Sequence, residues 1–234
     1  MKPTKVKPRA PMITILGEPG TGKTTLAATF PNPVFVRAED GLINTSVDAF
    51  PVVGGYSDLM EQLDWLIKEK HDYRTVVIDS VTALDDIFAS EIMKAENKDN
   101  LAHCLGGYGA GFQAVAKRHK DVRLKCEAIN RKGVAIVYVA HSTTEDVTPP
   151  DMESYTRYTL RMRDNAQQNY VDFADVVAFI RLKAFVSEGK AKSQSKRELV
   201  CFAHPAQISK NRYGINDPLV IETPEHNPLL EMIK

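Results

Sequence analysis

Residues 13–24, ITILGEPGTGKT, contain the P-loop pattern G-x-x-x-x-G-K-[ST] between Gly17 and Thr24. An apolar, β-branched run precedes the pattern and the helix-forming run Leu26-Ala27-Ala28 follows it, which is the strand–loop–helix context that a phosphate-binding loop requires. Glycines allow the backbone to curl until several N–H groups point at one phosphate, and the following helix adds its positive end. The sequence therefore predicts a nucleoside triphosphate site at this loop.

The loop also predicts ATP and Mg²⁺ as cofactors. Lys23 would reach the β- and γ-phosphates, and the Thr24 hydroxyl would ligate Mg²⁺. The other expected nucleotide contacts come from Gly17, Glu18, Pro19, Gly20, Thr21, Gly22 and Thr25.

Length, composition and charge restrict the class of protein. The chain has 234 residues, of which 43% are hydrophobic, enough for the core of one α/β domain. Its formal net charge is +0, so any nucleic acid site must be a local patch. Three separated cysteines predict reduced thiols, and no run approaches the length of about 18 apolar residues that a membrane span needs. We expect a cytoplasmic protein without a membrane partner, with a basic flexible tail over residues 1–11 and one domain over 12–234.

Two later apolar runs predict buried parallel strands that end at the nucleotide. Val76-Val77-Ile78 runs directly into Asp79, and ligands of α/β sheets bind at the carboxyl ends of the strands. Asp79 is therefore expected to hold Mg²⁺, with a helix cap as the alternative. Residues 134–140 end at His141, which would sense the γ-phosphate or, alternatively, be structural.

The C-terminal part predicts an antiparallel hairpin at the sheet edge, because residues 174–182 and 198–203 are strand-like and residues 189–196 resemble a turn. The expected fold class is α/β, with a mostly parallel central sheet flanked by helices.

Two irregular segments are candidates for contact with a single nucleic acid strand. Residues 105–111 are glycine-rich and include Tyr108, and residues 145–158 carry Pro149-Pro150 without a regular period, so a loop is expected there. Aromatic side chains interleaved with arginines suit base stacking and phosphate contact, and packing against the sheet is the alternative. The residues concerned are Tyr155, Arg157, Tyr158, Arg161 and Arg163.

The position of the catalytic carboxylate distinguishes classes of P-loop protein. In AAA-type proteins a glutamate follows the magnesium aspartate, whereas here Ser80 follows Asp79 and cannot act as a carboxylate base. Glu39 offers a carboxylate at the tip of the strand after the P-loop helix, where RecA-type ATPases place the glutamate that aligns the attacking water. A small-molecule kinase is disfavoured because no arginine-rich lid is recognisable.

The successive strand ends resemble the RecA/RadA core in order and spacing. They are residues 34–40, 76–84 and 137–141, and Lys210-Asn211-Arg212-Tyr213-Gly214 is similar to the Lys-Asn-Arg-Phe-Gly motif of RadA proteins, with Tyr213 in place of Phe. Over residues 12–222 the chain most resembles short, phage-encoded RecA-like ATPases that act as single-strand annealing recombinases.

This resemblance implies roles for several residues. Glu39 would orient water, and His141 would sense the γ-phosphate. Lys210 and Arg212 would reach the nucleotide of a neighbouring subunit and stabilise the transition state, as an arginine finger does. A homo-oligomeric ring or filament with ATP at the subunit interface follows, in a bacterial host cytoplasm.

The resemblance also implies DNA contacts. The two DNA-binding loops of the family correspond to residues 94–111 and 142–163, which makes Tyr108, Tyr155, Arg157, Arg161 and Arg163 the candidate contacts. The chain is short for a full recombinase, which favours annealing of single-stranded DNA with a single-strand-binding protein as partner. The alternative function is a nucleotide-gated loader or switch that recruits replication proteins.

Overall fold

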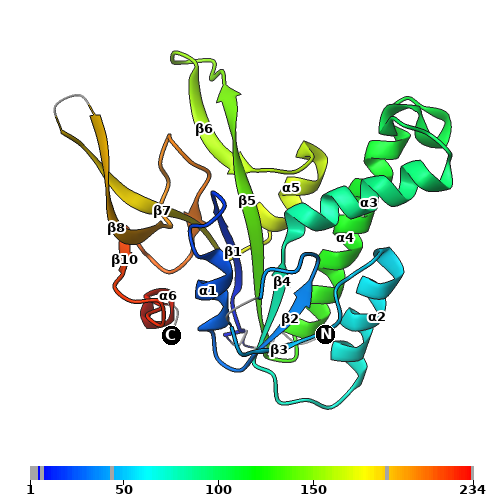
Figure 1. The fold of residues 1–234 in the computed structure, drawn as a ribbon, viewed down its shortest axis with the longest axis horizontal. Coiled ribbons are helices and arrows are strands. Elements are labelled where there is room, and N and C mark those ends of the chain that lie inside the picture. The colour runs from blue at the N-terminus through cyan, green and yellow to red at the C-terminus, as the bar shows by residue number, and fades with distance from the viewer. Residues whose placement is uncertain (1–4, 6–7, 43–44, 188–189, 233–234) are drawn as a thin grey trace.

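A mostly parallel sheet forms the centre of the molecule (Figure 1). The computed structural model describes residues 5, 8–42, 45–187 and 190–232. The strand order of the sheet is β10-β8-β7-β1-β5-β4-β2-β3, with β6 on β5 and β9 on β7. The strands are β1 (Met12–Gly17), β2 (Pro33–Arg37), β3 (Asp48–Ala49), β4 (Thr75–Asp79), β5 (Ala135–Val147), β6 (Tyr155–Leu160), β7 (Val176–Ser187), β8 (Lys190–Val200), β9 (Lys210–Asn211) and β10 (Leu219–Ile221).

Helices cover both faces of this sheet (Figure 1). They are α1 (Lys23–Ala28), α2 (Tyr56–Lys68), α3 (Val81–Ala95), the 3₁₀ helix η1 (Leu101–Gly106), α4 (Ala110–Asn130), α5 (Asp164–Val171) and α6 (Leu229–Met232). In the described part of the chain, no helix combines the length and the apolar character that crossing a bilayer demands.

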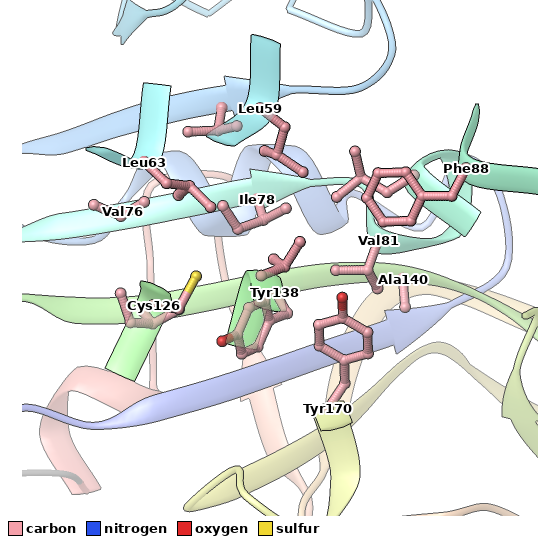
Figure 2. Packing of buried hydrophobic residues seen from close by; sticks show 14 of the residues in the cluster. Leu59, Leu63, Val76, Ile78, Val81, Phe88, Cys126, Tyr138, Ala140 and Tyr170 are labelled. Carbon is pink, nitrogen blue, oxygen red and sulfur yellow. The ribbon is translucent and has the colours of Figure 1, made fainter. Parts of the chain in front are cut away.

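Two apolar layers result from the alternation of side chains along β1. Ile13 and Ile15 face the layer that contains α1 and α6, whereas Met12 and Leu16 face α2, α3 and α4. Figure 2 shows the second layer, to which Leu63 of α2, Phe88 of α3 and Tyr138 of β5 all contribute. Because both faces are covered, the central strands are continuous apolar runs, as parallel strands usually are.

The register of the parallel strands gathers the predicted site at one edge. Gly17 at the end of β1 lies opposite His141 of β5, and Asp79 at the end of β4 lies opposite Val139 of β5 and Arg37 of β2. Since β5 lies between β1 and β4, the P-loop and Asp79 approach each other across β5.

The predicted α/β class and the edge hairpin are confirmed. β7 and β8 pair antiparallel from Phe179–Val200 to Ser187–Lys190. The turn expected over residues 189–196 was wrong for residues 190–196, because these residues belong to β8, while residue 189 lies outside the described part.

The loop expected over residues 145–158 was wrong. β5 continues to Val147 and pairs antiparallel with β6, from Ser142–Leu160 to Val147–Tyr155, so that Pro149-Pro150 lies in the turn of a second hairpin. Much of this hairpin is open to solvent on both faces, which removes the apolar alternation by which a strand is recognised in sequence.

Arg9 belongs to the segment expected to be a tail, and it contacts the domain. Its Nη2 lies 2.8 Å from Asp175 Oδ1, and its Nη1 donates to Asn130 Oδ1 at 2.9 Å.

Candidate functional site

A pocket of about 340 Å³ opens at the carboxyl edge of the sheet, where β1, β2 and β4 end and β5 continues past them. Loops and strand ends that are distant in sequence contribute to its wall. The lining residues are Gly20, Gly22, Lys23, Thr24, Thr25, Glu39, Gly41, Asp79, Val139 and His141.

Two glycines of the P-loop are required by the geometry of the backbone. A Cβ atom on Gly17 would lie 2.5 Å from the carbonyl oxygen of Ile180 in β7, so only glycine fits between the neighbouring strands. Gly22 has φ +88°, in the left-handed region that other residues avoid. Two glycines of the P-loop pattern are therefore required because the backbone of this loop does not accommodate a side chain at either position.

Lys23 lies across the inside of the loop. Its Nζ donates to the carbonyl oxygens of Gly17 at 3.0 Å and Glu18 at 2.9 Å. Burial lowers the pKa of Lys23, and the positive charge of Arg161 lowers it further. Neutral carbonyl oxygens thus hold the ammonium group at the pocket. Phosphate oxygens, which are negatively charged, could replace them as hydrogen-bond acceptors.

Thr24 and Asp79 form the expected metal-binding pair. Thr24 Oγ1 donates to Asp79 Oδ2 at 2.8 Å, and Asp79 is buried. Burial raises the pKa of Asp79, and the negative charge of Glu39 raises it further. Hydroxyl and carboxylate oxygens are the ligands that Mg²⁺ uses together with substrate phosphates, so this pair fits the ion.

Glu39 is held at the same pocket by two hydrogen-bonding neighbours. Its Oε1 accepts from Ser80 Oγ at 2.5 Å and lies 3.4 Å from His141 Nε2. The hydrogen bond from His141, followed by that from Ser80, lowers the pKa of Glu39 to about 2, although partial burial opposes the shift. Glu39 is therefore an ionised carboxylate at neutral pH that accepts protons weakly.

Ser80 and Thr82 hold two residues of the pocket through contacts that the sequence did not predict. Ser80 caps α3 by accepting from Ala83 N, and it also donates to Glu39. Thr82 Oγ1 accepts from the backbone N–H of His141 at 2.9 Å. The available signal in the sequence is a serine directly after the strand-end aspartate Asp79.

These elements match a known family. The model of a family described as an AAA domain matches residues 9–213. The chain belongs to this AAA domain family. No curated protein matches the chain.

Membership of the AAA domain family agrees with the P-loop, the central sheet and a nucleotide-binding role. In this member the carboxylate beside the metal pair comes from Glu39 at the end of β2, and the residue after Asp79 is Ser80.

Lys210 and Arg212 lie far from the P-loop of their own chain. β9 pairs with the start of β7 at Val176 and Val177, and therefore lies at the amino edge of the sheet. Lys210 Nζ donates to the carbonyl oxygens of Val171 and Asp172 at the end of α5, and Arg212 pairs with Asp175. Neither side chain can serve the nucleotide of the same subunit.

The candidate DNA contacts occupy three different environments. Arg157 pairs with Glu145, and Arg163 pairs with the buried Asp85, so both arginines are engaged within the chain. Tyr155 is half-buried on β6. Tyr108 is fully exposed, at a relative exposure of 108%, in the connection between η1 and α4.

Arg161 is the arginine of this group that lies beside the nucleotide pocket. Its backbone N–H donates to the carbonyl oxygen of His141 at 2.8 Å, and its side chain is exposed. Within the described ranges, its guanidinium has no hydrogen bond or ion pair.

The raised pKa of Asp79 gives a prediction for Asp79→Asn. The ionised carboxylate is disfavoured in the folded chain, so the amide should raise the melting temperature of the nucleotide-free protein at neutral pH by a few degrees. The difference should shrink as the pH falls through the folded-state pKa, because wild-type Asp79 then becomes neutral too. The same variant should lose the stabilisation that MgATP gives.

Thermal melts with and without MgATP measure both effects. Asp40→Asn is the matched control, since Asp40 is an exposed carboxylate paired with Arg37 outside the pocket. A lower melting temperature for nucleotide-free Asp79→Asn would contradict the assignment.

Proposed function

We propose that this protein is a Mg²⁺-dependent, RecA-like ATPase that binds single-stranded DNA and promotes annealing. The observation that supports the ATPase most strongly is the Glu39 carboxylate, which Ser80 and His141 hold beside the Thr24–Asp79 pair. A P-loop used only for binding has no need of a second carboxylate next to the metal pair.

The proposed chemistry follows from the charges of the pocket. Mg²⁺ held by Thr24 and Asp79 would neutralise charge on the β- and γ-phosphates. Lys23 would bind the same phosphates. With a pKa of about 2, Glu39 would align a water molecule by accepting its hydrogen bond, with little capacity to remove the proton fully. The ring of His141 lies against Glu39, and its backbone N–H donates to Thr82. His141 would sense the γ-phosphate next to the water that Glu39 aligns.

The shape of the molecule supports binding of a single strand at the same edge. The β5–β6 hairpin, the β7–β8 hairpin and the connection between α3 and α4 all extend beyond the carboxyl edge of the sheet (Figure 1). Tyr108 offers an exposed ring for stacking, and Arg161 offers a guanidinium without a partner among the described residues. Arg157 and Arg163 would contribute only by exchanging their present partners.

We further propose a homo-oligomer in which ATP lies between subunits, with a single-strand-binding protein as partner during annealing. The support is the position of Lys210 and Arg212 at the edge opposite the pocket. In a head-to-tail ring or filament in which the two edges of the sheet meet, this edge would face the pocket of the next subunit.

A nucleotide-gated loader or switch is the second candidate. It is favoured by the pairing of Arg157 and Arg163 within the chain, which reduces the positive charge available to DNA.

Glu39→Gln should lower the rate constant of ATP hydrolysis about a hundredfold or more, because an uncharged amide aligns water poorly. The KM for MgATP should change little, since Thr24, Asp79 and Lys23 remain. Steady-state phosphate release measures both constants. Asp40→Asn, the adjacent exposed carboxylate, should behave as wild type. Full turnover by Glu39→Gln would remove Glu39 from the mechanism.

Mixing two inactive variants tests the shared active site. Arg212→Ala keeps an intact pocket and Glu39→Gln keeps an intact Arg212, so mixed assemblies should regain activity at about one quarter of their interfaces, from random pairing in a closed assembly. Each variant alone should stay inactive. An unchanged, near-zero rate after mixing under conditions of subunit exchange would contradict action between subunits.

Arg161→Ala should weaken binding of a fluorescent oligothymidylate in the presence of a non-hydrolysable ATP analogue, and should reduce the slope of affinity against salt concentration. The effect should exceed that of Arg157→Ala, because Arg157 is paired with Glu145. Fluorescence anisotropy at several salt concentrations gives both quantities. If the wild type binds no oligothymidylate but still hydrolyses ATP, the loader or switch replaces the annealing function.

A further inference from the structure

An arginine of the edge hairpin lies directly on the P-loop. A Cβ atom placed on Gly22 would fall 2.0 Å from Arg197 Nη1 and 3.2 Å from its Cζ. Since a Cβ lies about 1.5 Å from its Cα, the guanidinium is in van der Waals contact with the Gly22 backbone. Gly22 and the three residues after it line the nucleotide pocket.

The position of Arg197 follows from the strand pairing of the hairpin. Arg197 lies opposite Leu182 of β7, two residues beyond Ile180. Ile180 and Leu199 pack in the apolar layer of α1, so residues two positions away along each strand face the same side. Arg197 therefore points to the side of the sheet that carries the P-loop and α1.

No ion pair to Arg197 is present among the residues that the structure describes. Its neighbour Glu198 faces the other side and is engaged by Arg181, with distances of 2.8 and 2.9 Å to Glu198 Oε1. Among the residues that the structure describes, Arg197 has neither an ion pair nor a side-chain hydrogen bond. A half-buried guanidinium on a phosphate-binding loop, without a partner in the described structure, would bind an anion through charge-assisted hydrogen bonds.

We propose that Arg197 is a second nucleotide-binding cation that contacts the phosphates of a bound nucleoside di- or triphosphate from the β7–β8 hairpin. The inference rests on the proposed nucleotide-binding function and adds a residue that no P-loop pattern contains. Its ligand is the phosphate group itself, which five guanidinium N–H donors can bind in a fork. The contact would also connect the position of the hairpin to the occupancy of the pocket.

Arg197→Met tests the contact by titration of fluorescent MgATP and MgADP analogues. Loss of one charge-assisted hydrogen bond should weaken binding about tenfold or more. Equal loss for both nucleotides places the contact on the α- or β-phosphate, and loss for MgATP alone places it on the γ-phosphate. Lys183→Met is the matched control, because it removes an exposed cation from the same hairpin and should leave both affinities unchanged.

A protection experiment needs no variant. Phenylglyoxal modification of wild-type Arg197, read by mass spectrometry of its peptide, should slow severalfold when MgADP is added. Arg131, exposed and remote from the pocket, should be modified at the same rate throughout. Unchanged nucleotide affinity in folded Arg197→Met, or no protection at a saturating MgADP concentration, overturns the inference. If wild type binds neither nucleotide, the proposed function itself fails, and the two failures are thereby distinguished.

Discussion

The buried carboxylate of Asp79 is the electrostatic constraint on which the site depends. In the described structure it receives one side-chain hydrogen bond, from the neutral Thr24, and it shares the pocket with a second carboxylate, Glu39. Burial of a charge without full compensation is costly, and Lys23, a cation that lowers the pKa of Asp79, is itself desolvated. A bound divalent ion would relieve the two carboxylates, while the phosphates would relieve Lys23. The pocket therefore favours a ligand that brings both charges together.

The first turns of α3 connect this constraint to the rest of the molecule. Ser80 holds Glu39, Thr82 holds the backbone of His141, and Asp85 holds Arg163 beyond the end of β6. Asp85 also contacts the buried His119 of α4, whose pKa burial lowers. The helix α3 and its N-cap Ser80 thus contact the Glu39 carboxylate, the backbone of His141 within β5 and the base of the β5–β6 hairpin. A displacement of Glu39 could therefore be transmitted through Ser80 and α3 to Arg163, next to the proposed DNA-binding edge.

The sequence predicted the parts of the structure that depend on a short, local pattern of residues. The positions of Lys23, Thr24 and Asp79 at one pocket could be predicted, because a P-loop and a buried strand each leave a local pattern. The β5–β6 hairpin could not, because solvent on both faces removes the apolar alternation. The pairing of Arg163 with Asp85 also escaped prediction, since the two residues are 78 positions apart and meet only in the folded chain. An arginine in a polar segment gives no local sign of whether it will face DNA or a buried carboxylate.

The cations at the opposite edge show how one fold can serve both a free subunit and the proposed assembly. Asp175 Oδ1 pairs with Arg212 at 3.2 Å and with Arg9 at 2.8 Å, while its Oδ2 accepts from Met12 N. If Arg212 turned towards a neighbour's nucleotide, Asp175 would keep Arg9 and the backbone donor, so no buried charge would lose all its partners. Lys210 would leave only two carbonyl oxygens at the end of α5, which water can satisfy. Breaking the contacts of Lys210 and Arg212 within the subunit therefore costs little free energy. Both side chains can be ordered in the free subunit and still be available to a neighbouring subunit.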